Sequence, residues 1–210
     1  MTRKPRSAPP KLDSTQQTLF DALIARGVGN RSILEIGCGA GRLHQRLLQE
    51  GASTAVGIEL MAEQVDRARA ASRRDGLDRR TTYVHDDFMN IADQIEAADI
   101  TILDKVLHCY HDPRGLIRQS AAQAKSVYAV TFPARRPLLA ASIRLLGPIL
   151  SLFLPFRVRF SPPERIREWI REHGLERVYH QETEMWHVEI YERAEAQDCS
   201  RPIAPKLSPR

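Results

Sequence analysis

Ile33-Leu34-Glu35-Ile36-Gly37-Cys38-Gly39-Ala40-Gly41 is the stretch that decides the fold. Its first four residues read as a buried strand, three glycines follow at alternate positions, and a helix is predicted to begin at Gly41. Eighteen residues beyond Gly41, Glu59 stands at the end of a second predicted strand, 54–58. Glycines let a ligand approach the backbone closely, and a carboxylate at the next strand tip can accept hydrogen bonds from ribose hydroxyls. Together these features predict a nucleoside-containing ligand at the carboxyl edge of a parallel sheet.

The rest of the chain alternates between predicted strands and helices. Strands are expected at 32–36, 54–58, 81–85, 100–103 and 126–132, and helices at 14–25, 41–49, 61–73, 91–96, 113–124 and 161–173. A hairpin made of 176–183 and 186–192 closes the chain. This alternation predicts a doubly wound, Rossmann-like α/β fold whose seven-stranded sheet is mostly parallel, with an antiparallel C-terminal hairpin. An apolar helical insertion, 135–160, is expected after the fifth strand.

The glycine spacing indicates which kind of nucleotide binds. A dinucleotide fingerprint would place its third glycine at position 42, where the chain has Arg42. A glycine-lysine-serine or glycine-lysine-threonine sequence is also missing, which excludes a P-loop. The loop is therefore not a pyrophosphate cradle.

Residues 34–41, joined to the downstream acid Glu59, resemble the first motif of the class I S-adenosylmethionine (SAM)-dependent methyltransferases. The resemblance implies that Glu35 orders the loop and helps to hold the ammonium group of SAM, often through water. It also implies that Glu59 binds the ribose hydroxyls. It implies adenine contacts from the residues after the second and third strands, and a methyl-donor end lined by Asp104. The SAM-binding residues implied in this way are Glu35, Gly37, Cys38, Gly39, Gly41, Glu59, Leu60, Met61, Asp87, Phe88 and Asp104.

Within that set, Leu60 and Met61 would pack on the adenine, Asp87 would accept from its amino group and Phe88 would flank the ring. Carboxylates are acceptor-only groups, which suits hydroxyl and amino donors. The alternative is that Glu59 and Asp87 are only solvated loop acids.

Residues 104–113, DKVLHCYHDP, follow the fourth strand and would lie beside the donated methyl group. His108 and His111 are candidate general bases, because histidine titrates near neutral pH, and Tyr110 is a third candidate catalytic residue. The alternative is that His108 and Tyr110 pack against or cap the following helix. No metal is expected, because His108, Cys109, His111 and Asp112 are too closely spaced for a conventional closed zinc site.

A further set of residues is similar to the magnesium-protoporphyrin O-methyltransferase group and its small-molecule relatives. This similarity implies transfer of a methyl group to a small, fairly apolar acceptor, with O-methylation favoured. It implies a methyltransferase of that kind more directly than it implies a porphyrin substrate. The residues that carry the similarity are Asp104, Val106, Cys109, Tyr110, Asp112, Pro162, Pro163, Trp186, Val188, Tyr191 and Arg193.

Composition fits a single domain of 210 residues with a net charge of +5. We expect a methyltransferase domain over 13–195, flanked by disordered tails at 1–12 and 196–210. Three widely separated cysteines and the lack of an apolar leader favour a cytoplasmic protein. The apolar stretch 138–156 has three readings: a lid over an apolar acceptor, a core helix, or a peripheral contact with an anionic membrane.

Two other functions remain open at this stage. The basic charge permits an RNA or protein methyltransferase, although no separate recognition domain is apparent and no specific nucleic acid is expected. A SAM-binding accessory protein without catalysis would also keep an intact glycine loop.

Overall fold

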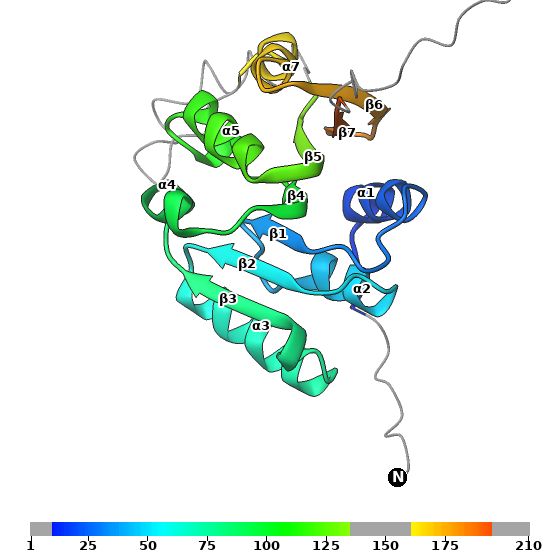
Figure 1. Ribbon diagram of the computed structural model, residues 1–210, viewed down its shortest axis with the longest axis vertical. Helices are drawn as coiled ribbons and strands as arrows, with labels where there is room; N and C mark the ends of the chain where they lie inside the picture. Colours follow the sequence, from blue (N-terminus) through cyan, green and yellow to red (C-terminus); the bar gives the residue numbers. More distant parts are fainter. Residues whose placement is uncertain (1–9, 135–160, 195–210) are drawn as a thin grey trace, which may run out of the picture.

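The computed structural model of the chain describes residues 10–134 and 161–194. Their centre is one seven-stranded sheet with the order β3-β2-β1-β4-β5-β7-β6 (Figure 1). Strands β1 to β5 are parallel, and β7 runs antiparallel to both β5 and β6. The predicted sheet and its closing hairpin are thereby confirmed. The strands are β1 (Ile33–Ile36), β2 (Ala55–Glu59), β3 (Thr81–His85), β4 (Ala98–Leu103), β5 (Ala124–Pro133), β6 (Leu175–Glu182) and β7 (Trp186–Arg193).

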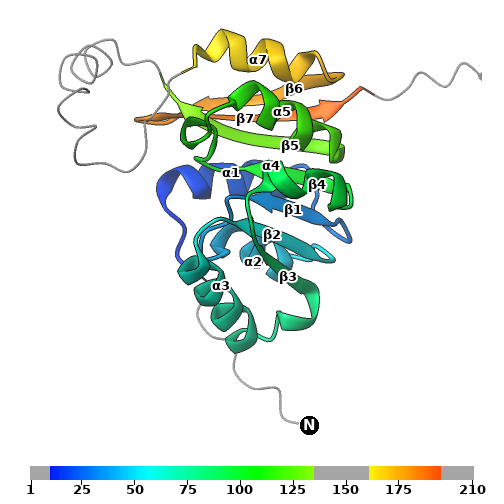
Figure 2. The same ribbon diagram turned by 90° about the vertical axis from the view of Figure 1, so that its left-hand side faces the viewer.

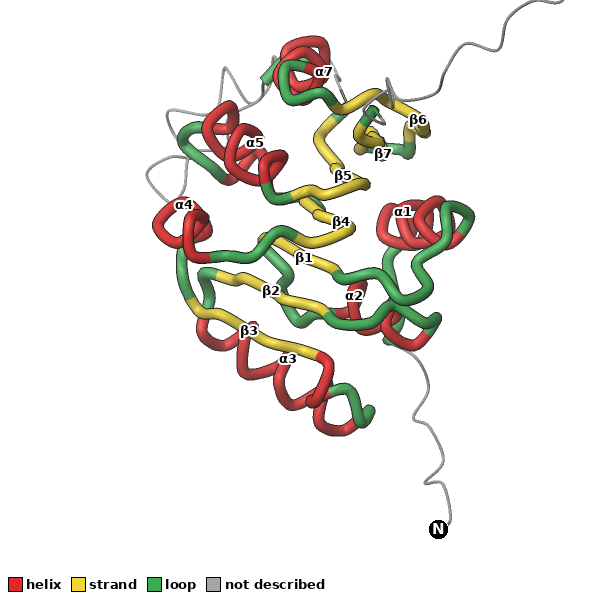
Figure 3. The backbone as a smooth tube through the Cα atoms, viewed as in Figure 1, coloured by secondary structure: helices red, strands yellow, loops and turns green. Residues whose placement is uncertain are grey.

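Helices cover both faces of this sheet, as Figures 2 and 3 show from two directions. One face carries α1 (Ser14–Ile24), α2 (Arg42–Gln49) and α3 (Ala62–Arg74), and the other carries α4 (Phe88–Ile91), α5 (Pro113–Ala122) and α7 (Pro163–Arg171). Two large apolar clusters fill the spaces between the layers. Strand β1 is buried along its whole length because it lies between both helical layers.

The chain reverses its direction of winding between β1 and β4, which are neighbours in the sheet although β2 and β3 lie between them in sequence. In open α/β sheets, ligands bind beyond the carboxyl ends of the strands at such a switch point. The loops after β1, β2, β3 and β4 all lie at this edge. The fold therefore brings the predicted site residues to one place.

Some expected boundaries are wrong. The short helix expected at 91–96 begins earlier, at Phe88, because the Asp87 side chain accepts a hydrogen bond from the Met89 backbone N–H (3.0 Å) and caps the helix there. Helix α7 begins two residues later than expected, at Pro163, with Pro162 as its N-cap and no side-chain cap.

The tail predicted over 1–12 is too long at its inner end. Leu12 is buried in the apolar cluster of α1 and α2, so the folded part of the chain already includes this residue. The predicted insertion 135–160, its apolar stretch 138–156 and the tail 196–210 lie outside the described residues. Among the helices that are described, none has the length and hydropathy needed to cross a membrane.

Candidate cofactor and active site

The glycine loop between β1 and α2 has two glycines with opposite surroundings. Gly39 has φ +52°, and a Cβ placed there would meet nothing within 4 Å. Gly41 has φ +73°, and a Cβ there would lie 2.9 Å from the side chains of His44 and Gln45. The space above Gly39 is where a ligand could lie against the backbone, whereas Gly41 is required by the packing of α2 beneath the loop.

Alanine substitutions should separate these two roles. Each substitution should lower the free energy of unfolding by about 1–2 kcal/mol, because both positions have left-handed backbone angles that alanine adopts only at a cost. Gly41→Ala should lower the free energy of unfolding by roughly a further 1–3 kcal/mol from overpacking, because the ends of His44 and Gln45 are held by hydrogen bonds. Gly39→Ala should instead mainly reduce SAM affinity. Urea denaturation and calorimetric titration would measure both effects, and equal stability losses in the two variants would contradict the assignment.

Glu59 ends β2 with its carboxylate under the glycine loop. Oε2 accepts the backbone N–H of Gly39 and Oε1 accepts that of Met61, each at 2.9 Å. A carboxylate oxygen has two acceptor positions, so each oxygen keeps one for a further donor. The structure thus orients both Glu59 oxygens beside the open space at Gly39, as a diol-binding group requires.

Leu60 and Met61 follow Glu59 and are among the few large apolar side chains that are exposed, at 65% and 56%. Their exposure leaves an apolar surface at the tip of β2. This surface fits the predicted contact with a flat, apolar ring such as adenine.

The prediction that the Phe88 ring flanks the adenine is wrong. Its side chain is completely buried in the cluster between the sheet and α4, α5 and α7. Asp87 remains at the site, and its Oδ1 accepts both the Met89 N–H and the Tyr110 hydroxyl (2.9 Å). The Cys38 side chain packs under the loop with Val65 and Tyr83. Its backbone N–H donates to the Ile58 carbonyl, and its carbonyl accepts the Gly41 N–H.

Glu35 is buried below the glycine loop. It is 2% exposed, and its Oε2 lies 2.5 Å from His44 Nδ1, while His44 Nε2 lies 2.9 Å from the Tyr83 hydroxyl. Burial raises the pKa of the Glu35 carboxyl, against the opposing effect of His44. This buried network joins β1, α2 and β3 below the glycine loop.

Sequence analysis missed His44, Gln45 and Tyr83 as parts of the site. The available signal was the position of His44 and Gln45 in α2, beside the buried residues Leu43, Leu47 and Leu48. Polar side chains among apolar core positions predict a buried hydrogen-bond network, although they do not identify its members.

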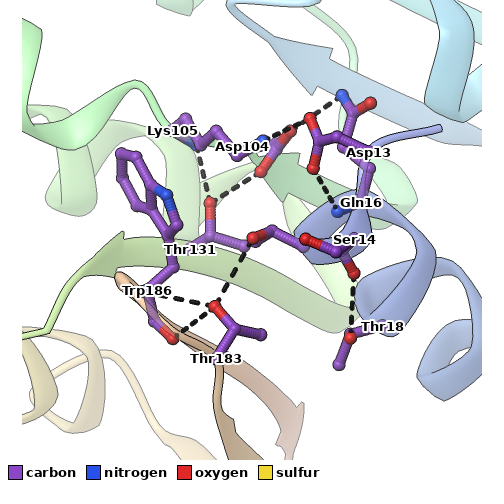
Figure 4. A network of polar contacts seen from close by, with 10 residues as sticks. Asp13, Ser14, Gln16, Thr18, Asp104, Lys105, Thr131, Thr183 and Trp186 are labelled. Carbon is purple, nitrogen blue, oxygen red and sulfur yellow. Dashed lines mark hydrogen bonds and ion pairs between the residues drawn. The ribbon is translucent and has the colours of Figure 1, made fainter.

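Asp104 directly follows β4 and belongs to the network in Figure 4. Its Oδ1 accepts the Thr131 hydroxyl (2.7 Å) and its Oδ2 accepts the Gln16 amide N–H (3.0 Å). The same Thr131 oxygen accepts the backbone N–H of Lys105, whose Nζ lies 2.6 Å from Asp13 Oδ2. Burial raises the pKa of Asp104. Helix α1 is therefore attached to the predicted methyl-donor end, a connection that sequence reasoning also missed.

The three candidate catalytic side chains have different surroundings. The Tyr110 hydroxyl donates a hydrogen bond to Asp87. Burial, and to a smaller extent this hydrogen bond, raises the pKa of Tyr110, so the hydroxyl stays protonated. His111 is exposed. His108 is half-buried, its ring centroid lies 5.3 Å from that of Trp186, and burial lowers its pKa below the usual value. Its Nδ1 is buried without a hydrogen-bond partner among the described residues.

Residues 33–127 match the model of a family described as a methyltransferase domain. No curated protein sequence matches the chain. Among solved structures, magnesium protoporphyrin IX methyltransferase from Synechocystis PCC 6803 with bound S-adenosylhomocysteine has a TM-score of 0.69 and 22% identity, over 85% of this chain and 83% of that chain. An O-methyltransferase family protein from Burkholderia thailandensis has a TM-score of 0.69 and 18% identity, over 87% of this chain and 57% of that chain.

An O-methyltransferase family 2 protein from Planctomyces limnophilus, in complex with apigenin, has a TM-score of 0.63 and 17% identity, over 87% of this chain and 62% of that chain. The switch point, the glycine loop and the oriented acid at the next strand tip define a nucleoside-binding α/β protein. The family match identifies it further: residues 33–127 are a methyltransferase domain, and the fold is shared with a magnesium protoporphyrin IX methyltransferase crystallised with S-adenosylhomocysteine.

Proposed function

We propose that the chain transfers the methyl group of SAM to an oxygen atom of a small, fairly apolar acceptor. The observation that carries this proposal is an apolar surface next to the loop that follows β4. The surface contains one titratable side chain, the imidazole of His108. A small pocket there is lined by Leu107, His108, Pro113, Phe132, Pro133, Ser161 and Ile166. Such a lining suits an apolar acceptor rather than a polyanion. It also contains one nitrogen, His108 Nδ1, that has no hydrogen-bond partner among the described residues.

In the proposed binding mode, the ribose hydroxyls donate to Glu59 and the adenine lies on Leu60 and Met61. Asp87 accepts from the adenine amino group while it holds Tyr110 in place. Asp104, fixed by Thr131 and Gln16, borders the methyl-donor end. These residues position and orient the reactants, and well-oriented reactants can save about 7–11 kcal/mol of the barrier.

When bound, SAM supplies a methyl group on a sulfonium that is already activated. A hydroxyl or phenol acceptor must lose its proton as its oxygen forms the new C–O bond, while the electron pair of the broken C–S bond stays on sulfur. His108 Nδ1 takes that proton, since its lowered pKa keeps the ring neutral and able to accept at neutral pH. A carboxylate acceptor is already deprotonated and needs no base.

We expect His108→Gln to lower kcat with phenol acceptors by roughly 100-fold or more, because the proton would lose its acceptor. Turnover of carboxylate acceptors should change little. With the unmodified chain, kcat for phenols should fall only below the ordinary histidine pKa of 6.5, since neutral His108 is the active form and its pKa is lowered. Release of S-adenosylhomocysteine measures these rates, and His173→Gln, at the end of α7, is the control.

The same assay tests the class of acceptor. Apolar phenols and carboxylic acids are expected to support turnover, whereas total RNA is not. Turnover with RNA alone, together with a steep dependence of RNA affinity on salt, would replace the small-molecule proposal by a nucleic-acid one. SAM binding without turnover on any acceptor would favour an accessory role.

A further inference from the structure

Three potential metal ligands lie on one face of the β6–β7 hairpin. His180 and Glu182 are two residues apart on β6, and His187 is the cross-strand partner of Glu182 on β7. Side chains two residues apart in a strand point to the same face, and directly paired residues are the closest neighbours across a ladder. The hairpin register therefore gathers two imidazoles and one carboxylate.

The distances between the ligand atoms fit a single small ion. His180 Nε2 lies 3.1 Å from His187 Nδ1, and His187 Nδ1 lies 3.8 Å from Glu182 Oε2. All three ligand atoms lie within 4.8 Å of one another. In a tetrahedral zinc site with bonds near 2.0–2.1 Å, neighbouring ligand atoms are roughly 3.3 Å apart. Only small side-chain adjustments separate this arrangement from a closed set of three ligands.

We propose that His180, Glu182 and His187 bind one Zn²⁺ ion, with the fourth coordination position open to solvent. Two imidazole nitrogens and one carboxylate oxygen are donors that suit zinc better than magnesium or calcium. Binding requires the lone pairs of His180 Nε2 and His187 Nδ1 to face the ion, so each ring carries its proton on the other nitrogen. The burial of His187 and the exposure of His180 and Glu182 leave the ion anchored on one side and accessible on the other.

The cluster has three charged neighbours. Two nearby guanidinium groups, those of Arg167 and Arg177, are both paired with the buried carboxylate of Glu189. Glu189 Oε1 lies 3.8 Å from His180 Nε2, so the negative charge of this carboxylate is on the side of the ring that would face the ion. The hairpin strands β7 and β6 lie three and four strands from β1, roughly 14 and 19 Å away at normal strand spacing, so this site is separate from the SAM loop.

The test is calorimetric titration of the untagged full-length protein with Zn²⁺, alongside the variants His180→Gln and Glu182→Gln. Both side chains are largely exposed, so these variants are expected to fold normally, and circular dichroism would verify this. We expect one Zn²⁺ per chain in the unmodified protein and in the control His173→Gln, and loss of that binding in both cluster variants. Co²⁺ should give the intense visible absorption of a four-coordinate site in the unmodified protein only.

Zn²⁺ binding that persists in both cluster variants, or no binding in the unmodified protein, would overturn the proposal. SAM affinity provides an independent readout, because it is expected to be the same with and without the chelator EDTA. Failure of the zinc proposal is therefore distinguishable from failure of the methyltransferase reading.

Discussion

Glu59→Ala is expected to weaken SAM binding roughly 100-fold while the protein stays folded. Hydrogen bonds to a charged acceptor contribute about 1.5–3 kcal/mol each, and loss of two ribose contacts at the lower end of that range gives about 3 kcal/mol. Isothermal titration with SAM and with S-adenosylhomocysteine measures this change. Glu63→Ala, an exposed acid one turn along on α3, is the matched control and should bind normally.

Glu59 also holds the backbone at Gly39 and Met61, so a loss of affinity could come from a disordered loop instead. A ligand without ribose hydroxyls separates the two explanations. The 2′,3′-dideoxy analogue of S-adenosylhomocysteine should bind the unmodified protein and Glu59→Ala almost equally. It lacks both ribose hydroxyls, so neither complex has the hydrogen bonds from these hydroxyls to Glu59. An equally large loss for this analogue would assign Glu59 to loop structure alone.

The sheet and the position of the site could be predicted from the sequence because their signals are local. A buried strand followed by Gly37, Gly39 and Gly41 has few structural alternatives, and the acid at position 59 lies where the next strand ends. Parallel topology then brings the two together without further information. The exposure of Leu60 and Met61 is consistent with the same reasoning.

Phe88 shows where that reasoning stops. An aromatic residue after a strand can face a ligand or the core, and a helix of only four residues is too short to show a periodic pattern. The outcome depends on Asp87, whose cap starts the helix at Phe88 and turns the ring inward. Whether an aspartate caps a helix or binds a ligand depends on its tertiary partners, and here Asp87 also holds Tyr110.

The polar networks could not be predicted for a related reason. Glu35, His44 and Tyr83 come from three elements that touch only in the folded chain, as do Gln16, Asp104 and Thr131. Sequence separation carries no information about such contacts without the topology. The same limit applies to the β6–β7 hairpin, where the register decides which side chains meet.

Glu189→Ala is expected to lower the free energy of unfolding by about 3–5 kcal/mol, as removal of one partner from a buried charge pair does. Its carboxylate is completely buried on β7, where Oε1 lies 2.7 Å from Arg167 Nη2 and 3.2 Å from Arg177 Nη1, and Oε2 accepts the Tyr191 hydroxyl. The variant would leave the largely buried Arg167 without its counter-charge between α7 and the sheet. Urea denaturation followed by circular dichroism measures the change.

A pair that joins the same strand to the end of α1, with a more exposed carboxylate, provides the control. Arg26 and Glu192 lie 3.6 Å apart with partly exposed side chains, so Glu192→Ala should cost less than about 1 kcal/mol. Combining Glu189→Leu with Arg167→Leu should recover part of the stability that is lost in Glu189→Leu alone, because the double variant has no buried unpaired charge at this place. Arg177 also loses its partner, but its side chain is 40% exposed and can be solvated by water. If the double variant lost more free energy of unfolding than the two single variants lose together, Arg167 would be stabilised by something other than Glu189. A loss below 1 kcal/mol for Glu189→Ala would mean that water replaces the carboxylate and that α7 is not held to β7 by this charge.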